Sequence, residues 1–130
     1  MIERRAFVAA AGAMIVGLTA RFAAAPQGTP KMYGLIGKMM SVPGRRDEVI
    51  AILLDGTNAM PGCLSYIVAK DPDDENGIWI TEVWDGEASH AASLKLPSVT
   101  EAIARARPLI AGFGQRLTTI PIGGVGLERR

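Results

Sequence analysis

The chain is poor in the residues from which metal and redox centres are usually built. Its 130 residues contain one cysteine, Cys63, and one histidine, His90. A single cysteine forms no internal disulfide, and a single histidine without neighbouring cysteines does not make a typical metal site. We therefore expect no disulfide and no zinc or haem-ligand site built from these residues, and we expect Cys63 to be a small buried side chain.

The sequence also lacks a charge excess and a long apolar run. Lys and Arg number 14 and Asp and Glu number 13, which gives a net charge of +1. Such a balance gives no reason to expect nucleic acid or an anionic membrane surface as a partner. The apolar run at residues 6–20 is shorter than the roughly 20 residues that cross a bilayer core.

The first 25 residues are organised as an export signal. Arg4 and Arg5 precede the apolar run, and three alanines at residues 23–25 follow it. This order is typical of a signal peptide, and the paired arginines indicate the twin-arginine type. We expect residues 1–25 to direct a periplasmic or secreted protein, with no stable membrane insertion after cleavage. The alternative is a disordered N-terminus on a cytoplasmic protein.

The rest of the chain divides into a linker at residues 26–31, one domain at residues 32–123 and a frayed tail at residues 124–130. Strand patterns occupy residues 32–41, 63–70, 78–84 and 115–122. Helix patterns occupy residues 45–58, a short segment around His90, and a segment opened by the capping-box sequence at residues 98–101.

This element order, β-α-β-β-α-α-β, predicts an α+β, ferredoxin-like domain. Its antiparallel four-stranded sheet carries the helices on one face. The other face has apolar side chains as well, among them Ile36, Ile67, Trp79 and Val83. Because no predicted element covers that second face, we expect a homodimer packed sheet to sheet.

Residues 78–90 bring together the side chains best suited to a site. Strand alternation puts Glu82 and Trp84 on the same, otherwise apolar face. The Asp-Gly pair that follows ends the strand, and Asp85 is predicted to cap the helix that carries His90. A carboxylate on an apolar face is costly unless it is paired or hydrated. The pattern therefore predicts a site at this strand-to-helix corner.

His90 is the candidate general base, because only histidine has an unperturbed pKa near neutrality. Glu82 is the candidate residue that orients the imidazole. The alternatives are a half-exposed surface histidine, and a structural ion pair of Glu82 with Arg105, Arg107 or Arg116.

Three more residues are candidates for binding a substrate. Trp84 offers a flat wall on which an aromatic ring can stack, and Tyr66 offers a hydroxyl donor on the neighbouring strand. Asn58 lies near the end of the first helix. The alternatives are that Trp84 is a core residue and that the hydroxyl of Tyr66 reaches solvent.

Several short motifs, taken together and in this order, resemble the antibiotic biosynthesis monooxygenase family, and within it the quinol monooxygenases. They are Glu82-Val83-Trp84 followed by His90, Met60-Pro61-Gly62-Cys63, Leu96-Pro97, and Arg107-Pro108-Leu109-Ile110. The resemblance runs from about Met32 to Ile122. It implies a dimeric α/β barrel with a pocket between the sheet and the helices of each subunit.

The resemblance also implies oxygenation by dioxygen without metal or flavin. The haem-degrading branch of the family has an Asn on its first strand, and residues 32–41 contain none. We therefore expect a cofactor-independent monooxygenase acting on a small quinol or phenolic aromatic. The alternatives are a non-catalytic ligand-binding or stress-response dimeric barrel, and an isomerase of small hydroxyketones.

Overall fold

The computed structural model describes residues 31–127, and the predicted export segment at residues 1–25 lies outside that range. Its elements in chain order are β1 (Tyr33–Ser41), α2 (Arg46–Gly56), β2 (Cys63–Lys70), β3 (Gly77–Trp84), α3 (Glu87–Ser93), α4 (Pro97–Ala106), the 3-10 turn η1 (Arg107–Leu109) and β4 (Ile110–Thr119). Within the described residues, no helix is long and apolar enough to span a membrane.

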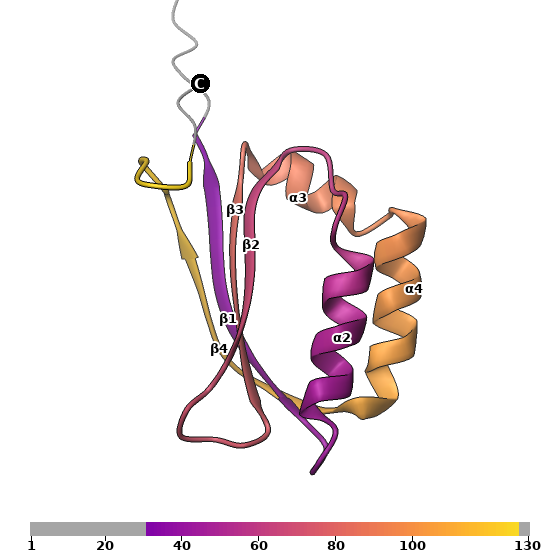
Figure 1. Ribbon diagram of the computed structural model, residues 1–130. Coiled ribbons are helices and arrows are strands. Elements are labelled where there is room, and N and C mark those ends of the chain that lie inside the picture. The colour runs from indigo at the N-terminus through magenta and orange to yellow at the C-terminus, as the bar shows by residue number, and fades with distance from the viewer. Residues whose placement is uncertain (1–30, 128–130) are drawn as a thin grey trace, which may run out of the picture. The chain divides into compact units, whose positions relative to one another are not determined.

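The four strands form one antiparallel sheet in the order β2-β3-β1-β4. All the helices lie against one face of this sheet, as Figure 1 shows. We call this the helix face and the opposite side the outer face. The predicted α+β, ferredoxin-like fold is therefore confirmed.

The core lies between the helix face and the two longer helices. Val49 of α2 and Ile78 of β3 are fully buried in the same apolar cluster. Gly56 allows α2 and α4 to approach closely, because a Cβ at that position would collide with the side chain of Ala102. A separate cluster, formed by Met60, Trp84 and Val99, lies at the end of β3 from which the chain enters α3. Removing large side chains such as these from a core typically costs several kcal/mol.

Two predicted helix caps are wrong. Asp85 does not cap α3, since the residue at the cap position is Gly86 and no side chain makes the capping hydrogen bond. The predicted capping box at residues 98–101 is not formed either, because α4 already begins at Pro97 after Leu96. Proline fits the first turn of a helix, where its missing N–H has no intrahelical partner.

The last strand begins earlier than predicted, at Ile110 rather than Gln115. Its pairing with β1 is irregular at two places, after Gly37 and after Met40 of β1. At each place β4 contains an extra residue, as in a β-bulge. Gly112 and Gly114, which precede the predicted strand, therefore lie within β4.

The outer face carries exposed apolar side chains and one polar network. Ile67 and Leu117 are 55% and 52% exposed. At the end of this face near the β2–β3 turn, the indole N–H of Trp79 donates to Asp71 Oδ2 at 2.9 Å. Lys38 Nζ lies 2.9 Å from the same carboxylate. The acidic turn is thus held against the sheet by Lys38 of β1 and Trp79 of β3.

Candidate functional site

A pocket of about 430 Å³ opens between the helix face of the sheet and α3. We call it the polar pocket, because polar side chains line part of its wall. Glu82 comes from β3, His90 from α3 and Arg116 from β4. The floor is Leu35, Gly37 and Ile80. The volume is within the range of natural small-molecule sites.

Gly37 makes room for this pocket. In the sheet, Gly37 of β1 lies between Ile80 of β3 and Arg116 of β4. Without a side chain at the centre of this row, the surface of the sheet is hollow there. A Cβ built on Gly37 would meet only the carbonyl oxygen of Gln115 within 4 Å, at 3.8 Å. The glycine therefore leaves open space, rather than allowing another group to approach.

The Glu82 carboxylate is placed between an indole and an imidazole. Trp84 Nε1 donates a hydrogen bond to Glu82 Oε1 at 2.9 Å. The same oxygen lies 4.0 Å from His90 Nε2, which is too long for a hydrogen bond but close enough for an electrostatic contact. The side chains of His90 and Glu82 are only 15% and 18% exposed. The tryptophan therefore fixes one carboxylate oxygen beside a partly buried imidazole.

Two aromatic rings hold the imidazole of His90. The ring of Trp84 meets it edge-on, with centroids 5.4 Å apart and planes at 75°. The ring of Tyr33, from the start of β1, lies 5.5 Å away on a tilted plane. Tyr33 and Trp84 lie directly opposite each other in the paired strands β1 and β3, so their rings contact His90 from neighbouring positions. His90 is therefore packed against the sheet and is not a free surface side chain.

Tyr66 lies behind the carboxylate, on the strand next to it. It pairs with Glu82 across β2 and β3 and packs against two of the core clusters. Burial, aided by the nearby Glu82 carboxylate, raises the pKa of the Tyr66 hydroxyl. Burial likewise raises the pKa of the Cys63 thiol, which is the behaviour of an unreactive structural cysteine.

The structure brings together part of the predicted site. Glu82 and His90 line the polar pocket. Trp84 is 1% exposed and belongs to the core, so its contact with the site is the hydrogen bond to Glu82. Tyr66 and the exposed Asn58 are not among the residues that line the pocket. The substrate-binding roles of Trp84, Tyr66 and Asn58 stay predictions.

The proposed ion pair of Glu82 is not formed among the described residues. Arg105 pairs instead with Asp55, with Nη2 3.3 Å from Oδ2. Arg107 is the exposed first residue of η1 and does not line the polar pocket. Arg116 shares the pocket with Glu82 without forming an ion pair with it. A positive charge therefore lines the pocket without neutralising the carboxylate.

Sequence reasoning missed Tyr33, Gly37 and Phe113 as site residues. A signal was available for the first, since the pairing of β1 with β3 in this fold puts Tyr33 opposite Trp84. No such signal existed for Phe113, which reaches the pocket only because β4 is bulged. Within residues 31–127, no group of three or more His, Cys, Asp or Glu side chains is arranged to hold a metal ion.

The chain is similar to known proteins in sequence and in structure. The family model described as antibiotic biosynthesis monooxygenase matches residues 32–105. A crystal structure from Chloroflexus aurantiacus assigned to that family is 61% identical, with a TM-score of 0.73, and the match covers 75% of this chain and 99% of the other. A search of curated proteins found no match.

More distant structures share the fold. A Pseudomonas aeruginosa protein is 16% identical with a TM-score of 0.64, and the match covers 74% of this chain and 99% of the other. A Bacteroides thetaiotaomicron protein, also assigned to the antibiotic biosynthesis monooxygenases, is 18% identical with a TM-score of 0.63, and the match covers 78% and 97%. At these identities the likeness concerns the architecture alone.

Proposed function

The chain belongs to the antibiotic biosynthesis monooxygenase family, and from that membership we propose that it oxygenates a small quinol or phenolic aromatic without a cofactor. The observation that carries the proposal is the pairing of Glu82 and His90 in one partly buried pocket, with Nε2 of the imidazole 4.0 Å from the carboxylate. This pair supplies the proton transfer that the chemistry needs.

The reaction begins with removal of a proton from the aromatic hydroxyl. His90 accepts this proton, and the Glu82 carboxylate beside it stabilises the imidazolium that forms. The resulting anion is electron-rich enough to reduce dioxygen. The substrate supplies all four electrons, so one oxygen atom leaves as water and the other stays on the ring. No external reductant is required.

Arg116 and Trp84 have supporting roles in this mechanism. The guanidinium of Arg116, on the wall of the same pocket, stabilises the negative charge of the deprotonated substrate. The indole N–H of Trp84 keeps the carboxylate of Glu82 turned towards the imidazole. Trp84 is therefore a positioning residue, since its ring is covered by the core.

The proposal is tested by oxygen uptake with a panel of hydroquinones and phenols. We expect uptake with at least one member, and mass spectrometry with labelled dioxygen should find one labelled atom in the product. Absence of uptake with the whole panel would favour a non-catalytic ligand-binding barrel. Turnover of a hydroxyketone under nitrogen would instead favour the isomerase.

We further propose that the protein acts as an exported homodimer. The exposed Ile67 and Leu117 on the outer face support a second copy as the covering partner. The export proposal depends on Arg4, Arg5 and the apolar run that follows them.

A further inference from the structure

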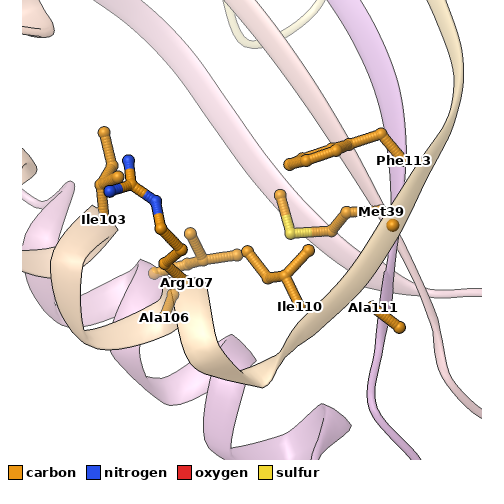
Figure 2. A pocket seen from close by; sticks show the side chains of 9 residues that line it. Met39, Ile103, Ala106, Arg107, Ile110, Ala111 and Phe113 are labelled. Atoms are coloured by element: carbon orange, nitrogen blue, oxygen red, sulfur yellow. The ribbon is translucent and has the colours of Figure 1, made fainter.

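A second pocket, of about 480 Å³, adjoins the polar pocket on the helix face. We call it the apolar pocket, because Arg107 is the only charged residue in its lining. Figure 2 shows Ile103 and Arg107 on one side of it, and the side chains of Met39 and Phe113 on the other. Its walls come from β1, α2, α4, η1 and the first residues of β4.

The two pockets are parts of one groove. Met39 and Phe113 line both of them. These two residues lie directly opposite each other in β1 and β4, so they form the boundary between the pockets. Methionine is unbranched and flexible, and the ring of Phe113 is 72% exposed. The boundary can therefore adjust to a molecule that extends across it.

The size of the groove exceeds what a single aromatic ring requires. A cavity of about 150 Å³ is enough to hold benzene. The polar pocket alone, at about 430 Å³, accommodates the ring, the dioxygen and several water molecules. A bare quinol bound beside His90 and Glu82 would leave the apolar pocket filled with water against Ile103 and Ile110.

We propose that the substrate is an amphipathic quinol with an apolar arm. Its hydroxylated ring binds in the polar pocket, and the arm crosses between Met39 and Phe113 into the apolar pocket. This inference rests on the proposed function, because it assigns the ring to the site of His90. It adds the substrate class, and it assigns specificity to residues that have no part in the chemistry.

Exposed apolar side chains in the apolar pocket support this assignment. Phe113 is 72% exposed and Ile103 is 37% exposed, although both are large and apolar. They line the same pocket instead of being scattered over the surface. Burial of such a cluster by an apolar ligand is favourable in proportion to the area removed from water.

The test is calorimetric binding without oxygen, which separates binding from turnover. The ligands are hydroquinone and its alkyl derivatives with arms of one to seven carbons. Each methylene that enters the apolar pocket should tighten binding by about fourfold until the pocket is full. Affinity that is independent of arm length would overturn the proposal, and so would failure of the whole series to bind.

A pair of matched variants identifies the pocket. Ile103→Asn places a polar group in the apolar pocket, whereas Leu54→Asn makes a similar change at a helical residue that is 51% exposed and lines neither pocket. Ile103→Asn should lower the preference for the seven-carbon arm over hydroquinone by about tenfold or more. Leu54→Asn should leave that preference unchanged. An equal effect of both variants would contradict the assignment.

The same ligands distinguish this inference from the proposed function. Binding that tightens with arm length and is lost in Ile103→Asn, but without oxygen uptake in air, would support the inference and reject the oxygenase. Oxygen uptake with hydroquinone that is unaffected by an arm would support the oxygenase and reject the inference.

Discussion

Replacing Gly37 with valine should close the polar pocket without disturbing the fold. The new side chain would project from the pocket floor between Ile80 and Arg116. Its Cβ would make only an ordinary contact, 3.8 Å from the carbonyl oxygen of Gln115. Gly37 is not among the glycines with positive φ, so valine adopts the backbone without strain. The volume for the ring therefore shrinks while the sheet stays intact.

We expect Gly37→Val to keep or raise the stability of the fold and to lower the turnover. Glycine in a strand interior is less stable than alanine by roughly 0.5–1 kcal/mol, so Gly37→Val should keep the free energy of unfolding or raise it by about 1 kcal/mol. Such a gain corresponds to a melting temperature about 4–8 °C higher for a domain of this size. Turnover should fall by about 10²-fold, the usual effect of displacing a substrate from its catalytic group by about 1 Å.

The assay combines thermal unfolding with kcat/KM for an active quinol. Gly37→Ala, which occupies less of the pocket, should lie between the wild type and Gly37→Val in activity. Full turnover in a stably folded Gly37→Val would refute the view that the ring binds above this glycine. Loss of the fold would show that the space at Gly37 is structural.

Three further predictions concern stability, assembly and export. The hydrogen bond from Lys38 lowers the pKa of Asp71 to about 2. The stabilisation that the ionised Asp71 gives the fold is therefore complete above the unfolded-state pKa of about 3.9, and it is lost as the pH falls towards 2. Asp71→Asn should make the melting temperature less sensitive to acid, and an unchanged acid profile would contradict this. Val83→Asp should convert a dimer to a monomer or an aggregate in sedimentation, because a buried unpaired charge is costly, and a monomeric wild type would reject the interface. Changing Arg4 and Arg5 to Lys should retain the protein in the cytoplasm, and unchanged periplasmic delivery would exclude the twin-arginine route.

The fold was predictable because its local patterns agree with one another. The strands at residues 63–70 and 78–84 alternate regularly and are bounded by Pro-Gly and Asn-Gly turns, so β2 was predicted at its observed bounds and β3 to within one residue. The helix face of β3, with Ile78, Ile80 and Trp84 buried, is also the one that alternation predicted. Regular periodicity without competing signals defines these elements.

The fourth strand was not predictable by the same rule. Glycine inside a strand pattern weakens it, and Gly112 and Gly114 lie at or beside the irregular places in the pairing of β4 with β1. Because of the extra residue, Phe113 and Arg116 line the same pocket although they are three residues apart. Strict alternation puts residues three apart on opposite faces, so the sequence pattern did not bring Phe113 to the site.

The candidate site was predictable as far as the chain keeps its residues close. Glu82 and His90 are eight residues apart across one tight turn, and the pattern was sufficient to expect their proximity. The burial of Trp84 could not be predicted in this way, because it depends on packing against Met60 and Val99, which come from distant segments. An indole two residues from a carboxylate has the same sequence signature whether it faces a ligand or the core. Only the packing of α4 against the sheet shows that this indole faces the core and not a ligand.

The central claim is that the imidazole of His90 removes the substrate proton in the polar pocket. The most direct measurement is the rate of oxygen uptake by His90→Ala with a quinol that the wild type oxidises, alongside Glu82→Gln. We predict a loss of roughly 10²- to 10⁴-fold for His90→Ala, which is the usual contribution of one general base, and a smaller loss for Glu82→Gln. Both variants should bind the quinol under nitrogen. Oxygen uptake by a folded His90→Ala at the wild-type rate would contradict the account.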